Sequence, residues 1–354
     1  MAAAALGWRT AAGIFAARIR LVSWRQTLER QWYEGGLWAD CLRPLGALYC
    51  ATAAWRRAHA GRSPGVLPSI VVGNLNVGGT AKTPTSIALL RYLQQRSWQP
   101  AAVSRGYGAH PPEREPYAVA PDDTPSHAGD EPLLLRQAAP VYLSRRRRAG
   151  IAAAAAAGHD IVVLDDGFQH LDLLPSLSLL LLQGARPLGN GRCLPAGPLR
   201  EGRSALGAAD ALLCDAAALA SPIAAELAVP KFLLQTEVTR LVSLADPGPE
   251  IPLTRLQGAR LHAVTGIARP QRLQRSLEAL GAEVTLHAFP DHHVFRRQDL
   301  ANIPGPLVMT SKDAVKCRHL AGLLEIWVLE IGVHWEPAFG TWLDEHLAAW
   351  RKPA

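Results

Sequence analysis

The chain has 354 residues, of which 49% are hydrophobic and 19% are charged, and its formal net charge at pH 7 is +7. This composition is typical of a globular protein and excludes a disordered chain, and the length is enough for about two domains. The five cysteines are scattered along the sequence without close pairs. That spacing argues against a disulfide framework or a zinc site and favours a reducing compartment.

The first 62 residues carry most of the excess positive charge. They contain nine arginines against three acids, and they hold five of the ten tryptophans. Arginine together with tryptophan is typical of a segment that lies in a lipid headgroup layer. A membrane-spanning helix needs about 20 apolar residues, and arginines interrupt the apolar runs here. We therefore predict that residues 1–62 lie on a membrane surface. A soluble basic arm, or one that touches nucleic acid, stays open as the alternative.

From residue 63 onward, short apolar runs alternate with helical stretches. This alternation predicts an α/β fold with a mainly parallel sheet between layers of helices, in which ligands bind at the carboxyl ends of the strands. We predict strands at 69–72, 101–104, 141–144, 160–164, 177–182 and 211–214, and helices at 82–95, 147–157 and 217–227.

A second series of strands follows a change in pattern near residue 230. We predict strands at 231–242, 261–265, 284–288, 307–310 and 326–331, with a polar, proline-rich break at 247–252. The boundary divides the rest of the chain into a nucleotide-binding domain at 63–230 and a smaller α/β domain at 231–354. We expect the smaller domain to close over the site.

A glycine-rich stretch between the first strand and the first helix has the context of a phosphate-binding loop. The N–H groups of such a loop surround phosphate oxygens, Lys82 can reach the β- and γ-phosphates, and the Thr83 hydroxyl can ligate Mg²⁺. The strict motif fails twice, because Asn76 and Ala81 stand where glycines are expected, so a plain glycine-rich turn is the alternative. However, the chain has only five lysines against 32 arginines. A retained lysine favours a phosphate site, where a compact point charge suits better than a planar fork. The candidate residues are Gly73, Asn74, Val77, Gly78, Gly79, Thr80, Ala81, Lys82, Thr83 and Pro84.

Acids and histidines at three other places could hold a metal or accept a proton. Asp165 and Asp166 follow a buried strand, where a nucleotide site places its metal-holding acid, although a capping aspartate is the alternative. Asp130 and Glu131 open a predicted helix and on their own would be read as an N-terminal cap. His292 belongs to a histidine pair that is structural or exposed unless it helps to deprotonate a hydroxyl.

Taken in order, these motifs resemble the tetraacyldisaccharide 4′-kinase family. The resemblance extends from about residue 36 to residue 320. It implies a P-loop NTPase-like fold and transfer of the γ-phosphoryl group of ATP to the 4′-hydroxyl of a tetraacyldisaccharide 1-phosphate, which gives lipid IVA. It also implies a peripheral protein on the cytoplasmic face of the bacterial inner membrane. The matching runs are 73–84, 104–108, 129–132, 165–170, 189–201, 291–292 and 310–316.

The resemblance also implies roles for single residues and for partners. Asp130 would be the base at the 4′-hydroxyl, supported by His292, and Lys82 would hold the phosphates. The implied partners are the lipid A disaccharide precursor and the membrane surface, with ATP and Mg²⁺ as cofactors, no nucleic acid, and a monomeric chain. The residues implied for nucleotide or metal are Thr83, Asp165 and Glu131 at the metal, and Asp166, Arg147 and Arg200 near the phosphates or sugar.

Two other functions stay open. A membrane-associated nucleotide switch, like the partitioning ATPases, also uses a Gly-Gly-x-x-Lys-Thr loop, but it has a lysine where Val77 stands here. A catalytically weak relative is suggested by Ala81, because a methyl group there crowds the approach of phosphate and disfavours positive φ.

Overall fold

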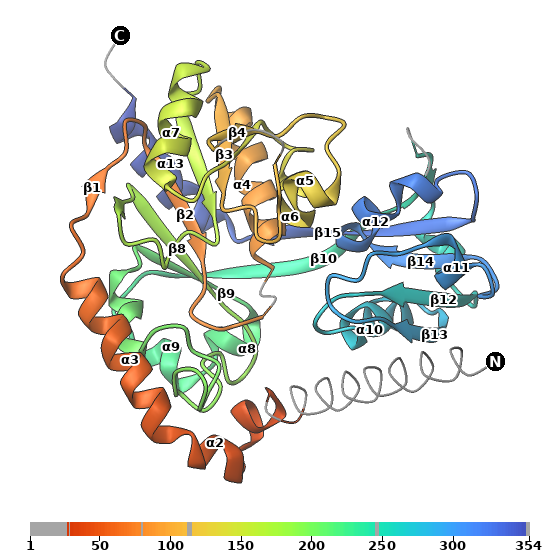
Figure 1. The fold of residues 1–354 in the computed structure, drawn as a ribbon, viewed down its shortest axis with the longest axis horizontal. Coiled ribbons are helices and arrows are strands. Elements are labelled where there is room, and N and C mark those ends of the chain that lie inside the picture. The colour runs from red at the N-terminus through yellow and green to blue at the C-terminus, as the bar shows by residue number, and fades with distance from the viewer. Residues whose placement is uncertain (1–26, 28, 79–80, 112–114, 245–247, 352–354) are drawn as a thin grey trace, which may run out of the picture.

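The computed structural model describes residues 27, 29–78, 81–111, 115–244 and 248–351 (Figure 1). Gly79 and Thr80, two of the expected phosphate-loop residues, lie outside the described residues, as do residues 1–26 of the expected membrane-surface segment. The described strands form one sheet of 13 strands and a separate two-stranded sheet.

The half of the chain that is predicted to bind nucleotide (the nucleotide-binding half) is built on six parallel strands, in the order β9-β8-β2-β6-β3-β5. Every residue of these strands is buried, as expected for near-continuous apolar runs covered on both faces. The predicted parallel α/β fold is therefore confirmed. The strands are β2 (Ser69–Gly73), β3 (Pro100–Ser104), β5 (Val141–Leu143), β6 (Ile161–Asp165), β8 (Leu177–Leu182) and β9 (Ala211–Cys214).

Helices cover both faces of this sheet. Helices α4 (Lys82–Gln95) and α6 (Asp130–Leu135) pack on one face, and α7 (Arg147–Ala156) packs on the other. Residues 217–227, expected as one helix, instead form α8 (Ala216–Leu219) and α9 (Pro222–Glu226). The break falls where Pro222 begins a new helix, because proline has no N–H to continue the helix before it.

The smaller half continues the same sheet through two long antiparallel strands, β10 (Lys231–Ser243) and β15 (Ile326–Trp335), which run from one half to the other (Figure 1). The first residues of β10 pair with β9, and later residues pair with β15. The other elements are β12 (Arg260–Thr265), β13 (Glu283–Ala288), β14 (Leu307–Thr310), α10 (Gln271–Ala279), α11 (Arg297–Leu300) and α12 (Ser311–Cys317).

The last helix, α13 (Pro337–Trp350), returns to the nucleotide-binding half. Its buried Phe339 contacts Phe232 and belongs to the core cluster that also contains Leu90 of α4. Tyr92 of α4 donates a hydrogen bond to the carbonyl of Gly340 at 2.9 Å. The contacts of α13 thus differ from the expected division, in which all of 231–354 formed the second domain.

Helices α2 (Leu37–Cys41) and α3 (Arg43–Ala58) precede the sheet. Gly46 and Arg57 lie on the side of α3 that packs against the rest of the protein. An added Cβ at Gly46 would meet the Ala196 Cβ at 2.8 Å, so this helix approaches closely only through glycine. The opposite face of α3 exposes large apolar side chains, including Leu48 at 64% and Trp55 at 63%. None of the described helices is long and apolar enough to cross a membrane.

Short elements complete the described chain. They are β1 (Ser63–Pro64), β4 (Tyr117–Ala118), α5 (Pro125–Ala128), β7 (Leu173–Leu174), β11 (Glu250–Ile251), and the 3-10 helices η1 (Arg203–Ala208), η2 (Leu253–Leu256) and η3 (Arg318–Leu320).

Candidate active site

The candidate phosphate loop leaves the carboxyl end of β2 beside the carboxyl end of β6. Val72 of β2 pairs with Asp165 of β6, so the loop and the acids emerge at the same edge of the sheet. Gly73 permits a close approach there, because an added Cβ would lie 2.6 Å from the Cβ of Phe168. The register of two neighbouring strands therefore brings together motifs that are far apart in the sequence.

Lys82, the first residue of α4, points its ammonium across the loop. Its Nζ donates to the Oδ1 of buried Asn74 at 3.1 Å and lies 3.6 Å from the Oδ1 of Asp166. Arg200 donates to both carboxylate oxygens of Asp166, at 3.0 and 2.8 Å. Burial alone would raise the pKa of Asp166, but Lys82 and Arg200 outweigh it and hold that pKa below its ordinary value.

Asp165 lies beneath this pair and is fully buried. Thr83 donates to its Oδ2 at 3.2 Å and Ser86 to its Oδ1 at 2.9 Å. Burial raises the pKa of Asp165 to about 7, and the negative charges of Glu131 and Asp166 add to the rise. The carboxylate thus sits in a pocket of negative potential that a cation would stabilise.

This donor set suits Mg²⁺, which prefers oxygen ligands and binds through one or two carboxylates together with substrate phosphates. Asp165 and the Thr83 hydroxyl supply such oxygens, and Glu131 lies within electrostatic range of Asp165. The described residues contain no cluster of three or more His, Cys, Asp or Glu side chains that would hold a metal alone.

Asp130, at the start of α6, is bound from the other half of the molecule. His292 Nδ1 lies 3.2 Å from its Oδ2, and no side chain caps α6. The capping role left open for Asp130 thus gives way to a contact between the halves. The neighbouring His293 instead pairs with Asp299 at 3.1 Å and stacks on Phe289, as a structural histidine would.

Glu131 also meets the other half, where Lys312 Nζ lies 3.2 Å from its Oε1. Burial alone would lower the pKa of Lys312, but the negative charges of Glu131, Asp291 and Asp130 together outweigh it and raise that pKa. Both acids at the start of α6 are therefore contacted from the smaller half.

The remaining candidate residues that the structure describes make no hydrogen bond or ion pair with the side chains of Lys82 or the two aspartates. Arg147 is buried, and its Nη1 donates to the Ser144 carbonyl at 2.5 Å; burial lowers the pKa of Arg147 to about 10. It reaches Asp165 and Asp166 through electrostatics and not through a hydrogen bond. The Val77 N–H is already used, because it donates to the Pro198 carbonyl at 2.8 Å. Gly78 has a φ of 116° and Pro84 lies in the first turn of α4.

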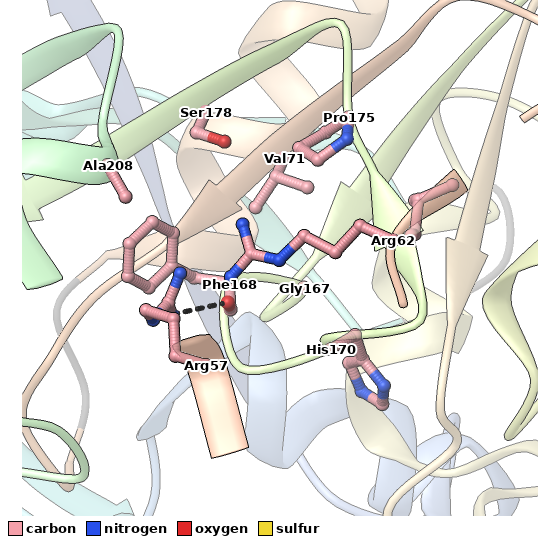
Figure 2. A pocket seen from close by; sticks show the side chains of 10 residues that line it. Arg57, Arg62, Val71, Gly167, Phe168, His170, Pro175, Ser178 and Ala208 are labelled. Carbon is pink, nitrogen blue, oxygen red and sulfur yellow. Dashed lines mark hydrogen bonds between the residues drawn. The ribbon is translucent and has the colours of Figure 1, made fainter. Parts of the chain in front are cut away.

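A further ion pair, not anticipated from the sequence, joins helix α3 to the back of the acidic loop. Arg57 donates to both carboxylate oxygens of Glu201 at 2.5 and 2.7 Å, and to the Phe168 carbonyl at 3.1 Å (Figure 2). Its guanidinium also lies 4.4 Å from the centre of the Phe168 ring. No local pattern in the sequence indicates this contact, because Arg57 and Glu201 are 144 positions apart.

Comparison with known proteins gives one consistent family. The profile described as Tetraacyldisaccharide-1-P 4'-kinase matches residues 38–348. A tetraacyldisaccharide 4'-kinase from Acidithiobacillus ferrooxidans is 54% identical over 331 residues, which cover 92% of this chain and 99% of that protein. One from Pseudomonas aeruginosa is 41% identical over 341 residues, covering 93% of this chain and all of the relative.

The chain belongs to the tetraacyldisaccharide 4′-kinase family. The fold agrees, since the crystal structure of LpxK from Aquifex aeolicus in complex with ATP superposes with a TM-score of 0.71. That structure is 25% identical and covers 89% of this chain and 99% of its own. The resemblance inferred from the motifs is thus confirmed.

In this family member, Ala81 has φ 54° and ψ 24°, in the left-handed region that favours glycine. Ala81→Gly should therefore raise the free energy of unfolding by up to about 1 kcal/mol and tighten ATP binding. Ala88→Gly, inside α4, is the matched control and should lower stability by about 1 kcal/mol. Denaturant unfolding and nucleotide titration measure both effects, and a loss of stability in Ala81→Gly would contradict the strain argument.

The contact with Asp130 raises the pKa of His292 above its ordinary value near 6.5. The stability that this pair contributes is fully present below pH 6.5 and is lost as the pH rises through the raised pKa. NMR titration should show a lower pKa for His292 in Asp130→Asn than in the unmodified protein. Burial and His262 lower the pKa of His287, and this second histidine should not respond. An unchanged His292 titration would show that the pair does not form in solution.

Proposed function

We propose that this protein transfers the γ-phosphoryl group of ATP to the 4′-hydroxyl of a tetraacyldisaccharide 1-phosphate, giving lipid IVA. The observation that carries this proposal is that two groups of side chains lie within electrostatic range of each other, through Glu131 and Asp165. Lys82, Asp165 and Asp166 form a site for phosphate and a cation on one half. Asp130 and His292 form a proton-accepting pair across the halves.

Phosphoryl transfer is mostly positioning and charge neutralisation, so each group needs only a limited role. Lys82 is placed to hold the β- and γ-phosphates, and Arg200 fixes Asp166 beside it. Thr83, Asp165 and Glu131 are the residues proposed to hold Mg²⁺, which when bound neutralises phosphate charge. The positive charge of Arg147 is proposed to stabilise Asp165 and Asp166 without a direct hydrogen bond.

Asp130 is proposed to accept the proton of the 4′-hydroxyl. An aspartate is a weak base in water, with an ordinary pKa of about 3.9. Its side chain is only 9% exposed here, and His292 binds one of its oxygens. Exclusion of water and a second proton carrier both favour transfer of the proton. Because Asp130 and His292 come from different halves, the reaction would depend on their being brought together.

Because the acceptor is a lipid, the active site has to lie close to the headgroup layer. Binding of the outer face of α3 to the membrane would hold it there. Leu45, Leu48 and Trp55 are 56%, 64% and 63% exposed, and basic Arg43 and Arg56 lie beside them. Apolar side chains next to arginines favour a helix lying in the headgroup region. We therefore propose that this face lies on the cytoplasmic surface of the inner membrane. We also propose that the chain acts as a monomer and binds no nucleic acid.

The reaction is tested with purified protein in detergent micelles, given ATP, Mg²⁺ and the tetraacyldisaccharide 1-phosphate. Phosphate should be incorporated into the lipid, and Asp130→Asn should lower kcat by about 100-fold or more while ATP still binds. Asp122→Asn, at an exposed aspartate, is the control and should keep the full rate. Hydrolysis of ATP without transfer would favour a nucleotide switch instead.

Membrane binding is tested by sedimentation with vesicles of phosphatidylethanolamine and phosphatidylglycerol. The variant Leu45→Ser, Leu48→Ser, Trp55→Ser should bind at least about 10-fold more weakly, because burying each such side chain is worth about 1.5–3 kcal/mol. The control is Leu323→Ser in the smaller half, which is 54% exposed and should sediment normally. Equal sedimentation of both variants would argue against α3 as the contact.

A further inference from the structure

The motif at 310–316 has no role in the chemistry above, yet it contributes two of the five lysines of the chain. Both lie on α12, one turn apart, and α12 packs against α6. Lys312 faces Glu131 at 3.2 Å, and Lys316 Nζ lies 4.0 Å from the Oδ2 of Asp130. The two acids that open α6 are thus each matched by one lysine of the smaller half.

Lys316 is buried in a way that needs an explanation. Its side chain is 3% exposed, its Nζ lies 2.8 Å from the Oδ1 of Asp313, and the ammonium stands 5.3 Å from the centre of the Phe295 ring. Burying an ammonium is costly unless it is paired and hydrogen-bonded. Within the described residues its Nζ makes no hydrogen bond of good geometry. The ammonium therefore has donors to spare toward Asp130.

Asp313 holds Lys316 in place from below. It is fully buried and accepts hydrogen bonds from the Thr265 hydroxyl at 2.6 Å, the Gly266 N–H at 3.1 Å and the Thr310 hydroxyl at 3.0 Å. These donors come from the ends of β12 and β14, which are neighbours in the sheet. Asp313 is therefore fixed by the fold, and it fixes the lysine in turn.

Lys316 and His292 approach the same oxygen of Asp130. His292 Nδ1 lies 3.2 Å from Oδ2 and Lys316 Nζ lies 4.0 Å from it. Oδ1 of Asp130 has no hydrogen-bond partner among the residues that the structure places. The hydrogen bond from His292 and the charge of the Lys316 ammonium both act on Oδ2, which restricts rotation of the carboxylate and leaves the other oxygen for the incoming hydroxyl.

We propose that Lys316 is a positioning residue for phosphoryl transfer, held by Asp313 and acting through Asp130. This inference rests on the proposed kinase activity and adds a residue to it. The lysine supplies, from the smaller half, the contact that orients the Asp130 carboxylate against His292. The base is then in its working orientation only when the halves are together.

The test uses the full-length protein in the micelle assay with ATP, Mg²⁺ and tetraacyldisaccharide 1-phosphate. Lys316→Met keeps the side-chain length and removes the charge. It should lower kcat by about 10- to 100-fold, since small misplacements of reacting groups cost about this much, while the dissociation constant for ATP stays unchanged. Arg318→Met, at an exposed cation in η3, is the matched control and should keep the full kcat.

A double-mutant comparison separates positioning from a purely structural role. Because Lys316 acts through Asp130, the variant Asp130→Asn, Lys316→Met should be no slower than Asp130→Asn alone. A further fall in kcat in the double variant, or a wild-type kcat in Lys316→Met, would overturn the inference. Absence of transfer by the unmodified protein would overturn the proposed function as well.

Thermal unfolding of each variant guards against loss of the fold. Should Lys316→Met unfold at the assay temperature, Asp313→Asn provides a second route. The amide can still accept hydrogen bonds from Thr265 and Thr310, but it loses the charge that holds Lys316. It should lower kcat without changing ATP affinity, and an unchanged kcat would contradict the proposal.

Discussion

The site depends on balancing four carboxylates that the fold brings to one place. Asp165 ends β6 and Asp166 follows it, while Asp130 and Glu131 begin α6. Repulsion among such groups is visible in Asp165, where burial and its acidic neighbours raise the pKa to about 7. Positively charged side chains have to offset the negative charge of the other three carboxylates, and they come from both halves.

The cations are divided between the halves in a way that gives each half a different task. Lys82 and Arg200, in the nucleotide-binding half, pair with Asp166. Lys312 and Lys316, in the smaller half, face Glu131 and Asp130. Three of the five lysines of an arginine-rich chain thus lie at the site. A compact ammonium fits a crowded group of oxygens where a planar guanidinium would not.

The connection between the halves is suited to this division. Two long strands, β10 and β15, carry one sheet across both halves, and α13 then packs on the first core (Figure 1). The smaller half is therefore tied to the larger one at both of its ends. These two attachments restrict how the smaller half can move. Its contacts with Asp130 and Glu131 at the start of α6 can therefore form in the same way each time the halves come together.

Much of the fold could be predicted because its strands are continuous apolar runs. The six parallel strands of the first half were placed to within one residue at each end, since full burial on both faces leaves a plain signal. The single helix expected at 217–227 failed at Pro222, and the return of α13 to the first core could not be read from residue 231 onward. Both depend on local proline geometry or on packing partners far away in the sequence.

The candidate site was predictable in its residue types but not in its pairings. Lys82 and Asp165 follow or precede recognisable elements, so their edge of the sheet could be inferred. Residue patterns alone did not indicate that His292 would meet Asp130, which only the resemblance to the family implied. The pairs Arg57–Glu201 and Lys312–Glu131 required the three-dimensional arrangement. Long-range pairs leave no local pattern, because each partner alone has an ordinary explanation as a cap or a surface charge.

The loop after β6 connects the candidate active site to helix α3. Asp165 and Asp166 contact Thr83 and Lys82 beside the phosphate loop. Phe168, two residues after Asp166, accepts a hydrogen bond from Arg57 of α3 (Figure 2). Arg57 and Glu201 are largely buried, so loss of one partner would leave an uncompensated charge. The helix that we propose lies on the membrane is therefore attached directly to the loop that carries the acids. If α3 lies in the headgroup layer as proposed, the depth of the lipid's acceptor hydroxyl relative to Asp165 would be set by the same loop and not by a flexible linker.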